Sequence, residues 1–171
     1  REEADPAEIE SNNVSLKVDI SPWEDHTLQI GYDLFEHENQ SWILSDWGSV
    51  VYGTSIKSRD AFDERERDKL SFDYIYSGEF LFLDSVHVKF YQQESESNQM
   101  MNEIRQGRTG SATRFRYSEF KQEIDGVYAQ LGSMFDIGNS KHTLTYGADY
   151  YTTYSETTRN GGTTDSFGVP M

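Results

Sequence analysis

The chain of 171 residues contains no cysteine, only 3 prolines, and half as many basic as acidic residues. Without cysteine it forms no disulfide, no thiolate metal site and no thiol nucleophile. The 15 Lys and Arg stand against 30 Asp and Glu, and a net charge of −15 argues against nucleic-acid binding, which needs clustered basic residues. No apolar run approaches the roughly 18 residues of a transmembrane helix.

Aromatic residues, in contrast, are abundant: 11 Tyr, 10 Phe and 3 Trp make up 14% of the chain. Acidic, polar chains are often disordered, but such chains are poor in aromatics, so this composition favours folded β structure. The chain begins at Arg1 without an initiator Met and stops just after a Gly/Thr-rich stretch. We therefore expect a fragment of a longer protein, for which a missing signal peptide says nothing about localisation.

Apolar and polar residues alternate along much of the chain. In Val14-Ser-Leu-Lys-Val-Asp-Ile20 every even position is apolar and every odd one polar. A period of two predicts strands with one apolar and one polar face. The pattern predicts six strands, near residues 13–20, 26–38, 67–77, 84–96, 117–135 and 142–156. In the fifth strand Gly126 or Gly132 is expected as a bulge point.

The expected connections alternate in length. Short turns are predicted near 21–25, 77–83 and 136–140, and long loops near 39–65, 98–113 and 157–171. Outer-membrane barrels have this arrangement, with short periplasmic turns and long extracellular loops. The predicted fold class is all-β: an antiparallel transmembrane β-barrel segment of about six strands, part of a larger barrel. A soluble lipocalin-like barrel with its apolar residues inward is the alternative fold.

Two stretches share His, Thr, Leu, Gly and Asp at the same offsets. "HTLQIGYDLFE" starts at His26 and "HTLTYGADYYTTYS" at His142, each directly after a predicted short turn. We expect both to be strands that leave the same side of a membrane at the same depth. The two histidines are then interfacial residues rather than ligands, and Gly31 and Gly147 leave room in the lumen for neighbouring side chains.

These stretches resemble a known family. "HTLTYGADYYTTYSETTRNG" (142–161) resembles the strand and loop signature of TonB-dependent outer-membrane receptors, in particular the haem/haemoglobin and transferrin/lactoferrin branch. "VSLKVDISPWEDHTLQIGYDLFEHEN" (14–39) and "DSVHVKFYQQESE" (84–96) resemble other strands of that family, and the pattern covers most of residues 12–160. The resemblance implies a barrel of about 22 strands around an N-terminal plug, with active uptake of an iron source.

Residues 1–171 are accordingly expected to be a partial barrel domain without the plug. Neither a TonB box nor the FRAP and NPNL boxes of haem receptors occur here, so no functional residue is carried over. The expected role is barrel wall and loop surface of a receptor in the outer membrane of a Gram-negative bacterium. Its expected partners are haem, a haem protein or another iron carrier, the TonB complex through the absent N-terminal region, membrane lipid and lipopolysaccharide. A passive porin-like barrel is the alternative function.

Five residues are candidates for ligand contact. Trp42, Trp47 and Tyr52 lie in a polar predicted loop, where exposed aromatics often mark recognition sites. They also suit a loop packed on itself. His37 and His87 carry imidazoles that suit haem iron, although a structural role is the simpler interpretation of each.

Charged clusters complete the set of candidates. The acidic stretch 60–68 suits either a divalent cation or a solvated, ion-paired loop. Arg105, Arg108, Arg114 and Arg116 suit lipopolysaccharide phosphates or an anionic substrate, or pairing with acidic loops. No nucleophile motif or carboxylate pair in an apolar pocket occurs, so we expect neither an enzyme nor a resident metal or cofactor.

Overall fold

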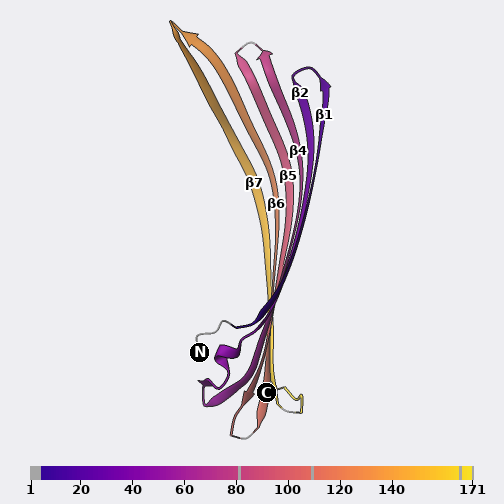
Figure 1. The fold of residues 1–171 in the computed structure, drawn as a ribbon, viewed down its shortest axis with the longest axis vertical. Coiled ribbons are helices and arrows are strands. Elements are labelled where there is room, and N and C mark those ends of the chain that lie inside the picture. Colours follow the sequence, from indigo (N-terminus) through magenta and orange to yellow (C-terminus); the bar gives the residue numbers. More distant parts are fainter. Residues whose placement is uncertain (1–4, 81, 109, 166, 171) are drawn as a thin grey trace.

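The structure is a computed structural model that describes residues 5–80, 82–108, 110–165 and 167–170. Nearly all of this chain forms one antiparallel sheet of long, twisted strands (Figure 1). The elements are β1 (Ala7–Trp23), β2 (His26–Trp42), η1 (Leu44–Asp46), β3 (Val50–Val51), β4 (Thr54–Phe80), β5 (Leu83–Gln106), β6 (Ser111–Ile137) and β7 (Ser140–Asp165). The prediction of an all-β antiparallel fold is confirmed.

The sheet is an open meander. Its strands lie in the order β1-β2-β4-β5-β6-β7, with the short β3 paired to β4, and every long strand pairs with its neighbours in sequence. In the described residues β1 and β7 form the two edges and do not pair with each other. The alternative of a closed lipocalin-like barrel is therefore wrong for this chain, whereas an open sheet agrees with a fragment of a larger barrel.

The two ends of the sheet differ. Short connections join β1 to β2, β4 to β5 and β6 to β7 at one end, at the top of Figure 1, which we call the turn end. Position 81, within the predicted turn 77–83, lies outside the described residues. The longer connections, η1 and both described chain ends lie at the other end, which we call the loop end. The short turns agree with the predicted positions, and left-handed backbone at Asp25 and Gly138 forms two of them.

The loop-end halves of the strands were predicted wrongly. The expected loops at 39–65, 98–113 and 157–171 shrink to connections at 43–53 and 107–110 and to a short segment after Asp165. Positions 109, 166 and 171 of those loops lie outside the described residues. The hydrogen-bonded ladder continues where hydropathy stops alternating, because most residues on both faces of the sheet are polar there. The acidic stretch 60–68, for example, lies within β4 and not in a loop.

Strand register gives the sheet two chemically different faces near the turn end. One continuous row across all six long strands is apolar and consists of Val18, Ile30, Phe72, Phe90, Val127 and Tyr150. The next row lies on the opposite side and consists of Lys17, Gly31, Ser71, Tyr91, Gly126 and Tyr151. We call these two sides the apolar face and the polar face along their whole length, since the pleat alternates side chains between them.

The chain has almost no interior of its own. Ile56 is the one buried hydrophobic residue among those described, and Ile30 and Phe72, in the middle of the apolar row, keep 40% and 49% of their surface exposed. A sheet with one apolar face requires a second layer or an apolar medium to cover it. Nothing in the described chain covers this one. None of the helices in the described ranges is long and apolar enough to cross a membrane.

Three glycines give room to a neighbouring strand. A Cβ on Gly126 would lie 2.3 Å from the Tyr91 ring, so this glycine admits a tyrosine and is not a bulge point. A Cβ on Gly132 would meet the Ser85 hydroxyl, and neither pairing of β6 shows a register shift in the described residues. A Cβ on Gly31 would lie 2.8 Å from the Ser71 hydroxyl, in agreement with the expected role of that glycine.

The repeated His-Thr-Leu motif has a structural explanation. His26 and His142 each lie at or near the start of a strand, directly after a tight turn. Each contacts an aromatic residue of the preceding strand. The ring centroids of His26 and Trp23 lie 5.9 Å apart, and those of His142 and Phe135 lie 5.7 Å apart. Both histidines therefore belong to an aromatic rim at the turn end, where we predicted an interface.

The open edges lead to a prediction about the isolated chain. We expect residues 1–171 alone to aggregate in detergent-free buffer, because two unpaired edges and an uncovered apolar face offer pairing sites for other copies. Sedimentation and thermal unfolding followed by circular dichroism test this. A monomer that melts cooperatively in buffer would contradict it.

Candidate functional site

The polar face at the loop end carries a network of charged side chains and a connection packed over it. The connection between β2 and β4 folds back over this face. The Gly48 amide donates to the Ile56 carbonyl (2.8 Å), and the Ile56 amide donates to the Ser49 carbonyl (2.9 Å). A register shift between Ile56 and Ser58 turns Ile56 toward this connection, where it is buried. The segment 43–53 is thus a packed flap and not a free loop.

An ion-pair network holds the flap to the sheet. The carboxylate of Glu103, on β5, is fully buried and accepts hydrogen bonds from Arg59 and Arg105; the distance from Arg59 Nε to Glu103 Oε2 is 2.7 Å. Arg59 also pairs with Asp46 of η1. Burial raises the pKa of Glu103, but the two guanidinium groups outweigh it and hold that pKa below its ordinary value. Glu103 is therefore a charged anchor through which Arg59 holds the flap.

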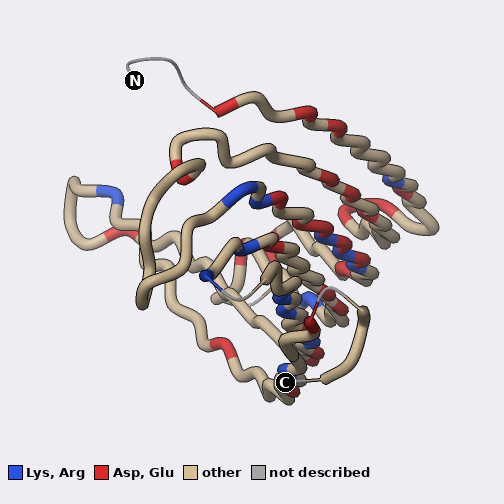
Figure 2. Tube along the Cα trace, turned by 90° about the horizontal axis from the view of Figure 1, so that it is seen from below, with Lys and Arg blue, Asp and Glu red and all other residues tan. Residues whose placement is uncertain are grey.

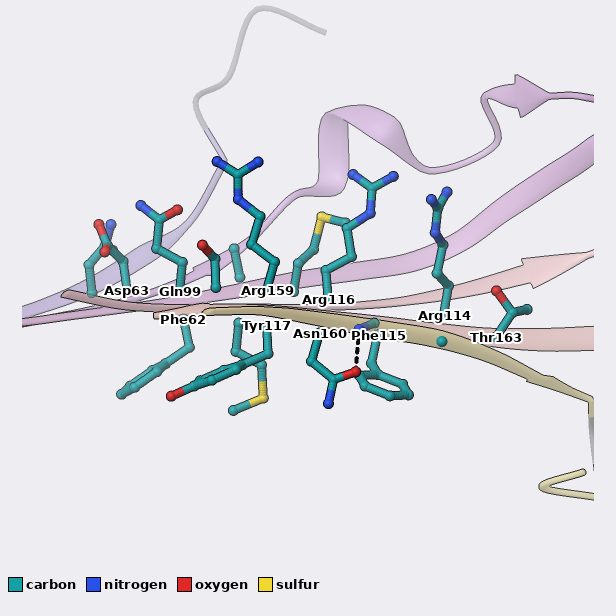
Figure 3. Close-up of a pocket in the computed structure, with 17 residues that line it drawn as sticks. Phe62, Asp63, Gln99, Arg114, Phe115, Arg116, Tyr117, Arg159, Asn160 and Thr163 are labelled. Atoms are coloured by element: carbon teal, nitrogen blue, oxygen red, sulfur yellow. Dashed lines mark hydrogen bonds between the residues drawn. The ribbon is translucent and has the colours of Figure 1, made fainter. Parts of the chain in front are cut away.

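Three further arginines lie near this network on the same face. Arg114 and Arg116 come from β6 and Arg159 from β7, and Figure 3 shows all three side chains on one side of the sheet, together with Gln99 and Thr163. None of the three side chains makes a hydrogen bond or ion pair with a described residue. Together with Ala61 and Met101 they line a hollow of about 900 Å³.

On the opposite face, Phe62, Phe115 and Tyr117 lie at the level of these arginines (Figure 3), and an acidic region follows toward the turn end. Beyond the apolar rows, carboxylates form an acidic band of Glu36, Glu38, Glu64, Glu66, Asp68, Glu94, Glu96, Glu119, Glu123 and Glu156. Burial, followed by Glu64, Glu36, Glu96 and Asp68, raises the pKa of Glu66. Figure 2 shows Asp and Glu positions, in red, along the strands. Strand β2 contains no Lys or Arg.

The acidic band contains one cation. Lys121, on β6, lies 2.7 Å from Glu119 and 3.6 Å from Glu96, and the hydrogen bond with Glu119 is the main cause that raises the pKa of Lys121. No group of three or more His, Asp or Glu side chains in the described ranges is arranged to hold a metal ion.

The structure separates the five residues predicted to contact a ligand. Trp42 ends β2, Trp47 follows η1 with half its surface exposed, and Tyr52, at positive φ between β3 and β4, is 98% exposed. These three belong to the flap or its border. The predicted basic cluster is divided as well, because Arg105 pairs with Glu103 while Arg114 and Arg116 stay unpaired with described residues.

The two candidate histidines lie far apart. His37, on the polar face of β2, accepts or donates a hydrogen bond with the Ser11 hydroxyl (2.7 Å) and stacks on Phe35. His87 is near the turn end, with its Nε2 2.7 Å from the buried carboxylate of Asp73. His37 lies level with Ser97, ten residues along β5 from His87, which corresponds to roughly 33 Å. The pair therefore does not bind a common ligand.

Sequence reasoning missed Glu103, Asp46 and Arg159. Arg159 was hidden because its proximity to Arg116 depends on the register Arg116–Gly161 between β6 and β7. Glu103 appeared as one more acidic residue in a predicted loop. One signal was present in the sequence. Glu103 and Arg105 are two residues apart, which places both side chains on one face if the segment is a strand.

The comparisons with known proteins add one relative. No protein-family model matches the chain. The hemoglobin-binding protein A of Haemophilus influenzae is 28% identical over 107 residues, which make up 60% of this chain and 11% of that protein. The chain thus corresponds to about a tenth of the length of this relative.

The buried carboxylate leads to a prediction about the flap. In the whole protein, Glu103→Gln should weaken the attachment of segment 43–53 by about 2–3 kcal/mol, because Arg59 and Arg105 lose a buried charged acceptor. Amide hydrogen exchange and protease cleavage within 43–53 measure this. Glu119→Gln, which removes the same charge from a partly exposed ion pair on the other face, is the control and should change little.

The lowered pKa of Glu103 sets the sign of the pH dependence. A carboxyl with a lowered folded-state pKa stabilises the folded state above its ordinary pKa, near 4.3, and loses this effect as the pH falls through the lowered value. Cleavage within the flap should therefore stay slow at neutral pH and rise only in strong acid. Equal cleavage of wild type and Glu103→Gln at pH 7 would show that Glu103 does not hold the flap to the sheet.

Proposed function

We propose that this chain is a barrel-wall and loop segment of an outer-membrane receptor that imports an iron source by TonB-dependent active transport. Haem, or haem carried by a host protein, is the proposed ligand. The observation that carries the membrane part is the continuous apolar row from Val18 to Tyr150, exposed on an open sheet. The ligand part rests on the similarity to a hemoglobin-binding protein.

The height of the apolar belt suits a bilayer. On β6 the apolar face runs from Phe135 at the turn end to Val127, and Asp125 follows. The length of this apolar stretch is close to the roughly 9–11 residues with which a tilted strand crosses a membrane. The rim of Trp23, His26, Phe135 and His142 then lies at one membrane interface, as aromatic girdles do.

The acidic band supports an orientation with the loop end outside the cell. Carboxylates such as Glu66 and Glu96 would be costly in hydrocarbon, so the membrane ends on the turn-end side of these residues. Short turns are periplasmic and long excursions extracellular in such barrels. The strands of 24–27 residues exceed a single crossing, and their loop-end halves project beyond the membrane as a continuous sheet.

In this arrangement the chain binds and transports but does not catalyse. The exposed Trp47 and Tyr52 of the flap face the medium in which a haem protein is met. TonB acts through a region outside this segment, and lipid and lipopolysaccharide surround the apolar belt. Nucleic acid has no place in the proposed function.

Paired substitutions test the membrane part of the proposal. In the whole protein, Ile30→Arg should destabilise the folded barrel by about 2–4 kcal/mol, because it places a charge on the lipid face near the middle of the belt. Gln29→Arg, one residue away on the polar face beside Asp19, should be tolerated. Denaturant unfolding in detergent or lipid measures both. Equal costs would show that the apolar face does not contact lipid.

A growth experiment tests the transport part. A Gram-negative strain that relies on this receptor should grow with haemoglobin as its sole iron source, and deletion of TonB should abolish that growth. The proposal requires both results. Growth that persists without TonB would instead identify a passive pore, and growth on neither haemoglobin nor haemin would remove haem as the ligand.

A further inference from the structure

Arg116 has an unpaired arginine on either side of it, and these two, Arg114 and Arg159, lie about 14 Å from each other. Arg114 and Arg116 are two residues apart on one face of β6, a separation of about 7 Å. Arg116 pairs in register with Gly161, and Arg159 lies two residues further along β7, a diagonal of about 7–8 Å. Gly161 has no side chain, so no side chain covers the sheet at this position between Arg116 and Arg159.

The carboxylates near this arginine group are already engaged. Glu103 is the register neighbour of Arg114 but gives its two oxygens to Arg59 and Arg105. Asp165, beyond Thr163 on β7, accepts hydrogen bonds from the amides of Phe167 and Val169 (both 2.9 Å).

One further carboxylate faces the same hollow from a distance. Asp63 accepts from Arg65 (2.7 Å) and keeps its Oδ1 without a hydrogen-bond partner among the described residues. It lies in the row of Arg159 but three strands away, about 14 Å at the usual strand spacing. The acidic band is on the opposite face. None of these carboxylates forms an ion pair with the three arginines, although the whole chain has a net charge of −15.

The chemistry of the surroundings narrows the class of ligand. Guanidinium groups bind carboxylate and phosphate oxygens through paired hydrogen bonds. Beside them, Met101 and Ala61 lie in the same row as Arg116 and supply an apolar surface. The hollow of about 900 Å³ is in the size range of pockets for small molecules, about 300–1,000 Å³.

We propose that Arg114, Arg116 and Arg159 form an anion-binding site for a small ligand with an apolar body and at least two acidic groups. This inference rests on the proposed function in one respect: haem, with its two propionates, is the ligand of this class that the receptor would meet. Inorganic or lipid phosphate shares the anionic chemistry without the macrocycle, and the experiment separates the two sources.

The experiment uses the whole receptor, purified in detergent, and three probes. Absorption titrations measure the binding of haemin and of haemin dimethyl ester, in which both propionates are blocked, and calorimetry measures inorganic phosphate. The variants are Arg116→Gln, Arg159→Gln and their combination. Lys121→Gln is the matched control, because it removes the same charge from the same strand on the opposite face. Migration of unheated samples on gels verifies that each barrel is closed.

We expect each single variant to weaken haemin binding about tenfold, the usual loss for one charge-assisted hydrogen-bonding partner. The dimethyl ester should bind weakly and equally to all proteins, and Lys121→Gln should match wild type. Arg116→Lys should lose part of the affinity, because an ammonium keeps the charge but not the paired hydrogen bonds.

The remaining outcomes separate the site from the proposed function. Phosphate binding that is lost in the variants while haemin binding stays constant would support the anion site and assign it to a phosphate. A double variant that binds haemin and phosphate like wild type would overturn the site. If the wild type then still captures haemoglobin, the proposed function survives without the site. A variant-sensitive phosphate response without any haemin or haemoglobin binding would leave the site and remove the function.

Discussion

The backbone ladder is the constraint on which the rest of this structure depends. A single-layer sheet has no interior, so each strand satisfies its amides and carbonyls only through its two neighbours. That requirement holds over strands of up to 27 residues, long past the point where side chains stop alternating. The side chains of each face therefore suit the surroundings of that face. Among the described residues, Ile56 under the flap is the one hydrophobic side chain buried as in an ordinary core.

The same ladder separates charge across the thickness of one sheet. Successive residues of β4 such as Glu64, Arg65, Glu66 and Arg67 point alternately to the two faces, so a stretch that is nearly neutral in sequence becomes an acidic band on one side and a basic surface on the other. The arginines of the polar face then divide again. Arg59 and Arg105, which pair with Glu103, stabilise the flap, whereas Arg114, Arg116 and Arg159 form no ion pair with a described residue.

Sequence reasoning was reliable where one face was apolar. Alternation around Ile30, Phe72 and Tyr146 predicted the strands, their faces and the tight turns, because a buried or lipid-like environment leaves a period of two in the hydropathy. It failed beyond Glu38, Glu96 and Glu156, where most residues on both faces are polar and hydropathy carries little information about backbone pairing. Of the arginine group, the sequence indicated Arg114 and Arg116 as part of a basic cluster but not Arg159, since Arg116 and Arg159 meet only through a register that no local pattern specifies.

The meander order also bears on how the sheet is made. Every long strand pairs with the strand before and after it, joined by tight turns at Asp25 and Gly138 and by short connections such as 107–110. Closing such small loops costs little entropy, so hairpins form early, before contacts between distant parts of the chain. A sheet of this kind grows by adding one hairpin at a time to an exposed border strand. In the described sheet, β1 and β7 are the edge strands at which a further hairpin would pair.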